Sequence, residues 1–327
     1  MSPDLPFALL AGAVLGASAH RAGLCTVKAV AEVMTSRRGQ IMWSFVKASL
    51  WTAGGLALAS LLGRDVGLGQ RAITISGLFG GLLFGLGAGW NGSCSVSTMS
   101  RLAEGHVVMG FTIAGWAVAI PAAASLWPGL YAPAVEGGMP FWWPMPVIGW
   151  MCHEVWGLWR RRAGAVSAIR TGYWPLSIAV LLIALANVTL LLIGRPWSFT
   201  ATIVCATTKA SIAPCAQAGG LWLISMSTFA AMTASALQRG TFRLRRPRLR
   251  AISRHFGAGL VMGCGSVLIP GGNDGLILFG LPSLSPHALP SWLALLFGVW
   301  LALTLMRFFG GRVPKIYCEG DVCKSVM

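Results

Sequence analysis

The chain contains very little charge, and least of all negative charge. Only 10% of its 327 residues are charged, and 9 acidic residues stand against 25 lysines and arginines. Hydrophobic residues make up 55% of the chain and the mean hydropathy is +0.70, which excludes an ordinary soluble domain of this size. The cationic residues cluster between apolar segments, a pattern typical of membrane topology and not of nucleic-acid binding. The composition therefore predicts an integral membrane protein.

The sequence also lacks a catalytic or cofactor-binding constellation. Its 5 histidines are scattered without the paired spacing of an intramembrane haem site, and no nucleotide-binding loop or Ser/His/Asp set can be placed. Near the C-terminus, Cys318 and Cys323 lack the C-x-x-C spacing of redox motifs and have no matching Cys or His pair for zinc. We therefore expect a protein that is not an enzyme and that holds no cofactor and no metal.

Apolar segments recur along the whole chain, at about the 20 residues that a membrane-spanning helix needs. We predict an all-α polytopic membrane protein with about nine transmembrane helices and additional short broken or re-entrant helices. Threading the segments alternately through the membrane puts the arginines of 37–38, 160–170 and 239–254 on the same side as the C-terminus. The positive-inside rule makes that side cytoplasmic and the N-terminus external.

Residues 82–105, LLFGLGAGWNGSCSVSTMSRLAEG, combine features that do not occur together in a simple membrane helix. The run begins apolar, loses regularity at repeated glycines, and then presents Gly92, Ser93 and Cys94 before a polar continuation. Irregular backbone at membrane depth is tolerated only where protein buries it or where it lines a wet cavity. We therefore predict a helix break with Cys94 facing a substrate path. A pair of Arg101 with Glu104 is expected near its exit.

An internal repeat is indicated when the two parts of the chain are laid side by side. The segment that begins at Cys25 aligns with the segment that begins at Cys205, and the same shift lays the Gly-rich turn of the first part over residues 271–274. Lys28 and Lys209 occupy matched positions in this alignment. They are candidates for attracting an anion toward the path, with snorkelling to the membrane surface as the alternative.

The repeat predicts a division of the chain into two pseudo-symmetric halves, 1–165 and 166–316, followed by a cytoplasmic tail, 317–327. If the halves enter the membrane in opposite senses, the transport site lies between them at the midplane. We expect the tail to be disordered, with a sulfur-accepting or sensing role as the alternative. Several of the 8 cysteines lie in apolar runs, so we expect free thiols and no disulfides.

The motifs around the cysteines resemble those of a known membrane family. The Gly-x-x-x-Gly-x-Gly run of 81–87 and the Gly-Ser-Cys-Ser-Val-Ser-Thr turn of 92–98 look like the signature of the YeeE/YedE sulfur-transport family. The Arg-Ala-Gly-Leu-Cys run of 21–25 resembles that family's first cysteine motif, and 194–197 resembles a mid-chain motif. The resemblance covers most of the chain and is most specific around Cys94.

The resemblance implies uptake of a sulfur-containing anion, with thiosulfate as the first choice, through a narrow path lined by cysteine thiols. It implies Cys25 and Cys94 as path residues, and the internal alignment adds Cys205. The second-half turn carries Asn273 where the family usually has a cysteine, so Cys264, nine residues earlier, is considered as a substitute. Candidate supporting residues are Gly92, Ser93, Lys28, Lys209 and Asp274.

The sequence leaves the role of Asp274 and the choice among three functions open. A carboxylate within a membrane segment is costly, so Asp274 is expected either to act on protons or anions in the path or to cap a helix. The expected partners are a small sulfur oxyanion, membrane lipid and a cytosolic sulfur-carrier or regulator protein, without nucleic acid. The alternative functions are a transporter-like membrane sensor of sulfur compounds and a membrane thiol oxidoreductase, and the latter predicts a disulfide between path or tail cysteines.

Overall fold

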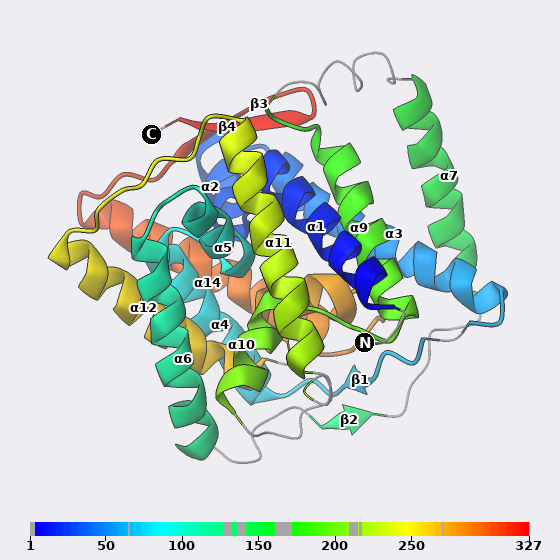
Figure 1. Cartoon of the computed structure of the whole chain (residues 1–327), viewed down its shortest axis with the longest axis horizontal. Coiled ribbons are helices and arrows are strands. Elements are labelled where there is room, and N and C mark those ends of the chain that lie inside the picture. The colour runs from blue at the N-terminus through cyan, green and yellow to red at the C-terminus, as the bar shows by residue number, and fades with distance from the viewer. Residues whose placement is uncertain are drawn as a thin grey trace.

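The computed structural model describes residues 4–64, 66–126, 133–135, 142–160, 172–208, 215, 218–269 and 271–326, and it is mostly helical (Figure 1). The helices before residue 127 are α1 (Leu5–Ala22), α2 (Thr26–Ser36), α3 (Gln40–Leu61), α4 (Ile75–Asn91), α5 (Ser95–Ala103) and α6 (Val108–Leu126). The later helices are α7 (Pro144–Arg160), α9 (Leu176–Leu192), α10 (Phe199–Thr207), α11 (Ala218–Gln238), α12 (Leu249–Leu268), α13 (Gly272–Gly275), the π-helix η2 (Leu276–Gly280) and α14 (Ala288–Phe308). The short strands are β1 (Gln70–Arg71), β2 (Ala134–Val135), β3 (Lys315–Glu319) and β4 (Val322–Val326).

Four long helices are each followed directly by a short one: α1 by α2, α4 by α5, α9 by α10, and α12 by α13 with η2. Two of these breaks depend on a glycine in the left-handed region, where a side chain would be strained. Gly23 ends α1 with φ 63°, and Gly92 ends α4 with φ 72°. Cys25 and Cys94 then occupy the N-cap positions of α2 and α5. The break predicted before Cys94 is therefore confirmed.

The described part of the chain contains four helical segments that are long and apolar enough to cross a membrane, or five if α12 and the bent α13–η2 segment form one span. These four segments are Leu5–Ser36, Val108–Leu126, Gly220–Gln238 and Ala288–Phe308. The predicted number of about nine spans is not confirmed, since helices such as α9 are apolar but only 17 residues long. Large apolar side chains are exposed around the bundle, including Phe7, Leu185 and Phe297, as a lipid-facing surface requires. The protein is thus a multi-pass membrane protein.

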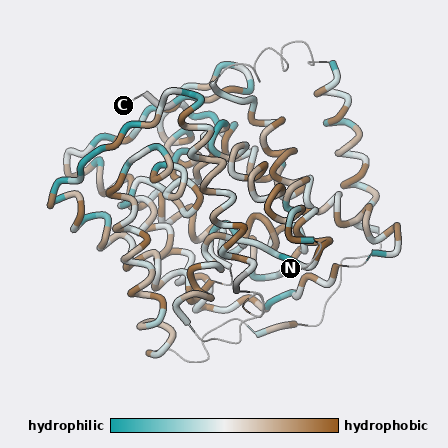
Figure 2. Tube along the Cα trace, in the orientation of Figure 1, coloured by the Kyte–Doolittle hydropathy of each residue, from teal (hydrophilic) through white to brown (hydrophobic). Residues whose placement is uncertain are grey.

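The two ends of the bundle differ from its middle. The start of α1 lies near β1 and β2 at one end, and the β3–β4 hairpin lies at the other (Figure 1). Hydrophilic residues gather along the chain near the hairpin, whereas hydrophobic residues dominate the helices between the ends (Figure 2). We call the two ends the N-side and the C-side of the molecule.

Glycines allow the central helices to approach each other closely. Helix α4 packs against α12 and α14, and α6 packs against α12. A Cβ atom at Gly85 of α4 would lie only 2.1 Å from the carbonyl oxygen of Leu295 in α14. A Cβ at Gly259 of α12 would lie 2.2 Å from the carbonyl oxygen of Thr112 in α6. Small residues at such contacts bring helix backbones together, which is how membrane helices associate without a hydrophobic driving force between them.

The tail is ordered, so the prediction of a disordered end is wrong. Strands β3 and β4 form an antiparallel hairpin in which Cys318 pairs with Cys323. The hydroxyl of Ser36 at the end of α2 donates to the carbonyl oxygen of Ile316 at 2.7 Å, which ties the hairpin to the helical body. The composition of a short polar segment does not predict long-range contacts of this kind.

The expectation of free thiols is wrong for half of the cysteines. Disulfides join Cys205 to Cys215 and Cys318 to Cys323. The free cysteines of the described residues are Cys25, Cys94, Cys152 and Cys264. The location of a cysteine in an apolar run did not determine whether its thiol is free, because the fold brings the two sulfur atoms of each pair within bonding distance.

We predict that Gly259→Ala destabilises the protein by about 1–3 kcal/mol, since the new methyl group would force α12 away from the backbone of α6. The measurement is the melting temperature of the purified protein in detergent. Gly110→Ala in α6 is the matched control, because nothing lies within 4 Å of the Cβ position there. Equal melting temperatures for the two variants would contradict the close α6–α12 contact.

Candidate substrate path

Two helix breaks bring Cys25 and Cys94 to the same place, although 68 residues of sequence separate them. Both side chains are buried, with 1% and 2% of their surface exposed. Ser97, in the first turn of α5, lies between them: its hydroxyl donates to Cys25 Sγ at 3.0 Å and lies 3.5 Å from Cys94 Sγ. The three side chains form what we call the thiol cluster. Ser97 was not among the predicted site residues, although it belongs to the quoted Cys94 motif.

Asn273 reaches the thiol cluster from a third break, the one between α12 and α13. Its Nδ2 donates to Thr26 Oγ1 at 3.1 Å, and Thr26 Oγ1 lies 3.3 Å from Asn273 Oδ1. Thr26 directly follows Cys25 in the sequence, and Asn273 lines the same cavity as Cys94. The second-half turn thus contacts the first helix break through the amide of Asn273.

Asp274 holds the start of α10. Its Oδ2 accepts a hydrogen bond from the backbone N–H of Thr200 at 3.1 Å, and its Oδ1 accepts one from Thr200 Oγ1 at 2.6 Å. The positive end of a helix dipole stabilises a carboxylate in this position. Asp274 was expected either to act on protons or anions in the path or to cap a helix. Its geometry is that of a helix cap, but the capped helix is α10 and not α13, on which Asp274 lies.

A buried network around Asn91 stabilises the α4–α5 break, and the sequence reasoning missed it. Asn91 Nδ2 donates to the carbonyl oxygen of Ser93 and to Thr98 Oγ1, both at 3.0 Å. Asn91 Oδ1 accepts from Thr112 Oγ1 at 2.8 Å and lies 2.7 Å from His255 Nδ1 of α12. The network joins α4, α5, α6 and α12 and leaves the Asn91 side chain fully paired. The sequence feature that could have indicated this network is an asparagine, Asn91, at the end of an apolar glycine-rich helix.

A large cavity opens on the C-side of the thiol cluster. It has a volume of about 390 Å³, and Cys25, Ser97 and Gly92 are among its lining residues. Its other lining residues are mainly polar and include six cationic ones, Lys28, Arg101, Arg239, Arg243, Arg245 and Lys324. We call this the C-side cavity. Its charge makes it attractive to anions.

Two further cavities continue from the cluster toward the N-side. A central cavity of about 50 Å³ is lined by Cys94, Asn273 and Asp274 together with apolar side chains such as Phe45. An N-side cavity of about 240 Å³ is lined by Arg71, His287 and the glycines of the α13–η2 segment. Leu24 borders both the C-side and the central cavity. The α13–η2 segment borders both the central and the N-side cavity, through different residues.

Other predicted positions lie away from the cluster. Cys205 is bonded to Cys215, and Cys264 of α12 lines none of these three cavities. The alignment of Cys25 with Cys205 is wrong in register, since Cys25 precedes a short helix and Cys205 lies within one. Ser198 holds the position before α10 that Cys25 holds before α2.

The candidate cations and the predicted ion pair have separate outcomes. Lys28 lines the C-side cavity and donates to the carbonyl oxygen of Gly23 at 3.3 Å. Lys209 lies outside the described residues. Glu104 Oε1 lies 3.3 Å from His20 Nε2, and no ion pair of Glu104 with Arg101 is found among the described residues. The helix break turns Glu104 toward α1, so sequence proximity to Arg101 did not decide its partner.

Comparison with known protein families identifies the family of the chain. A family model for sulphur transport matches residues 21–301. The chain belongs to the sulphur transport (YeeE/YedE) family. The match contains the thiol cluster and the helix breaks that precede Cys25, Cys94 and Asn273, and it supports membrane transport of sulfur compounds. No curated protein matches the chain significantly.

We predict that His287 makes the protein less stable in mild acid. Burial, and then the charge of Arg71, lower the pKa of His287 from 6.5 to about 4. Between these values the unfolded chain binds a proton that the folded chain does not, so stability falls as the pH drops through this window. The folded His287 Nδ1 lies 2.8 Å from Ser285 Oγ.

Melting temperatures measured between about pH 7 and about pH 5 check this expectation. His287→Asn, which keeps a polar partner for Ser285, is expected to lose less thermal stability than the intact protein over that range. His153→Asn on the exposed face of α7 is the matched control and should behave as the intact protein. An identical pH response of His287→Asn and the intact protein would contradict the assignment.

Proposed function

We propose that this member of the sulphur transport family takes up thiosulfate across the bacterial inner membrane through a path that runs past the thiol cluster. The observation that carries the proposal is the position of Cys25, Ser97 and Cys94 between the central and the C-side cavity. The N-side faces outward and the C-side faces the cytoplasm. Asn273 takes the place of a path thiol from the second half of the chain.

Weak hydrogen-bond donors suit a path through which an anion has to move. A thiosulfate dianion sheds much of its water on entry and needs replacement donors at each step. Neutral thiols donate weakly, so they accept the anion without trapping it. The first turns of α2 and α5 add backbone N–H groups, and neither helix has a side-chain cap at Cys25 or Cys94. By contrast, Ser198 caps α10 with its hydroxyl.

Electrostatics gives the path a direction. The central cavity is narrow and mostly apolar, so it limits water and selects a small partly dehydrated ion. The cationic lining of the C-side cavity then stabilises the anion after it passes the thiols. Arg71 at the N-side cavity provides positive charge at the entrance.

We further propose that the chain forms two inverted halves, 1–165 and 166–316, with nine spans. Nine of the described helices have 17 or more residues. The helices from α1 to α6 follow the order long, short, long, long, short, long. The same order recurs from α9 to α14, and α7 lies between the two sets. The first set has four long helices, and α7 adds a fifth before the second set begins. After an odd number of spans the second set enters the membrane from the opposite side, which supports the inversion.

Uptake of ³⁵S-labelled thiosulfate into cells that lack their own sulfur importers tests the proposal. The intact protein is expected to support uptake, and Cys94→Ala and Cys25→Ala are each expected to reduce it at least about tenfold, as loss of about 1.4 kcal/mol or more of stabilisation along the path would do. Cys264→Ala is the matched control, because Cys264 lines none of the three cavities.

Expression of each variant is checked by immunoblot of the membrane fraction. Normal uptake by Cys94→Ala would overturn the proposed path. No uptake by well-expressed intact protein, with gain of uptake in Asn273→Cys, would mean that Asn273 has turned this member to another substrate or to sensing.

A further inference from the structure

The C-terminal hairpin places a cysteine pair at the mouth of the proposed path. Cys323 and Lys324 line the C-side cavity, which Cys25 and Lys28 also line. The hairpin, β3 with β4, begins at Lys315, whereas the sulphur transport match ends at residue 301. The pair therefore lies outside the residues that the family model matches.

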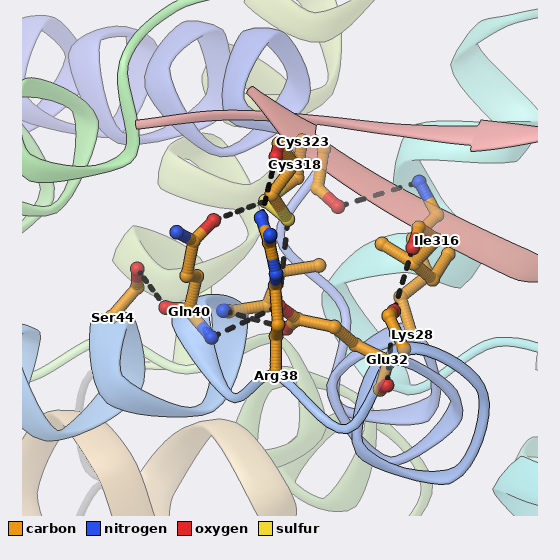
Figure 3. Close-up of a disulfide and its surroundings, with 11 residues drawn as sticks. Lys28, Glu32, Arg38, Gln40, Ser44, Ile316, Cys318 and Cys323 are labelled. Carbon is orange, nitrogen blue, oxygen red and sulfur yellow. Dashed lines mark hydrogen bonds between the residues drawn. A yellow bond between two sulfur atoms is a disulfide. The ribbon is translucent and has the colours of Figure 1, made fainter. Parts of the chain in front are cut away.

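Several contacts fix the hairpin in this place. Besides the Ser36 contact, Arg38 Nη1 donates to the carbonyl oxygen of Cys318 at 3.2 Å (Figure 3). Asp321, in the turn of the hairpin, accepts hydrogen bonds from the first amides of α9: Leu176 N–H bonds its carbonyl oxygen at 2.7 Å, and Ser177 N–H bonds its Oδ2 at 2.9 Å. An anion that leaves the thiol cluster therefore meets a positioned cysteine pair.

We propose that Cys323 and Cys318 receive the sulfane sulfur of thiosulfate at the exit of the path, so that the hairpin is a sulfur-transfer site. The proposal rests on the proposed function, because transport supplies the thiosulfate. Cys323 is the attacking residue and Cys318 is the resolving residue. The disulfide present in the structure is the state that follows one turnover.

The environments of the two sulfur atoms support this division of roles. Cys318 is buried, and its Sγ lies 3.4 Å from Oε1 of Glu32, which is itself completely buried (Figure 3). After reduction a thiol at Cys318 donates to that carboxylate, which keeps it protonated. Cys323 Sγ lies 3.7 Å from the neutral Oε1 of Gln40 and borders the cationic cavity, whose charge favours the thiolate.

The chemistry balances in two steps. The Cys323 thiolate attacks the sulfane sulfur, the S–S bond of thiosulfate breaks, and sulfite leaves with the electron pair of that bond. A persulfide remains on Cys323. The Cys318 thiol then attacks Cys323 Sγ, forming the disulfide, and its proton leaves with the terminal sulfur as hydrosulfide. Two electrons from the cysteine pair have reduced the sulfane sulfur, so a soluble dithiol on the C-side must reduce the disulfide for another turnover.

A metal site is the competing interpretation of the same side chains. The ligand atoms of Glu32, Cys318 and Cys323 lie within 4.8 Å of one another. The disulfide occupies both sulfur atoms, and both oxygens of Glu32 already accept backbone N–H groups, from Gln40 at 3.0 Å and Ile41 at 2.9 Å. Metal binding would have to displace the backbone bonds of Glu32 and would need both cysteines to stay reduced, whereas sulfur transfer keeps the backbone bonds of Glu32 and forms the disulfide as part of its cycle.

The test uses the full-length protein, purified in detergent, reduced with a dithiol and freed of it. Thiosulfate labelled in the sulfane position is added, and sulfite, hydrosulfide and labelled tryptic peptides are measured. The intact protein is expected to release stoichiometric sulfite and hydrosulfide and to end as the disulfide. Cys318→Ser is expected to release sulfite alone and to keep the label as a persulfide on Cys323. Cys323→Ser is expected to release neither product.

Cys152→Ser, which changes an exposed thiol of α7, is the matched control and should behave as the intact protein. Label on Cys25 or Cys94 in place of Cys323 would overturn the proposal, as would sulfite release from Cys323→Ser. Thiosulfate uptake is measured on the same variants in proteoliposomes. Uptake without sulfite release overturns the sulfur-transfer site and leaves the transport function, whereas sulfite release without uptake supports the site and overturns the transport function.

Discussion

The need to satisfy polar backbone groups away from water is the constraint on which this structure depends. A helix that breaks at membrane depth exposes N–H and C=O groups, and these must find partners within the protein. The α4–α5 break meets this requirement with the Asn91 side chain, and the α12–α13 break places Asp274 on the start of α10. The starts of α2 and α5 have no side-chain cap at Cys25 or Cys94, and in the proposed path their backbone N–H groups are the donors for the anion.

Close helix packing holds the breaks in register. Glycines in α4, α6, α12 and α14 let carbonyl groups of one helix occupy the space where another helix would have a side chain. Thr112 shows how packing and the site are linked: its backbone lies against Gly259, and its hydroxyl bonds Asn91 at 2.8 Å. A displacement of α6 would therefore disturb the α4–α5 break and, with it, the position of Cys94.

The polarity and the charge of the lining side chains differ from one region of the proposed path to the next. The central cavity is small and mostly apolar, and the thiol cluster adds two thiols and a hydroxyl. The arginines of the C-side cavity and Lys28 then favour anions on the side where the hairpin lies. In the proposed sulfur-transfer site, Glu32 reverses this field locally, because it lies beside Cys318 and not beside the cavity. Transport and sulfur chemistry are thereby given neighbouring but distinct electrostatic surroundings.

The sequence by itself determined the membrane class, the break before Cys94 and the family, since apolar runs and glycine-rich turns act over a few residues. Only the tertiary structure decided the partners across the chain. Thr26 meets Asn273 from 247 residues away, and Glu104 turns to His20 and not to nearby Arg101. The disulfide of Cys205 and the ordered hairpin were likewise missed. Side-chain partners depend on how helices cross and where they break, and neither periodicity nor composition carries that information.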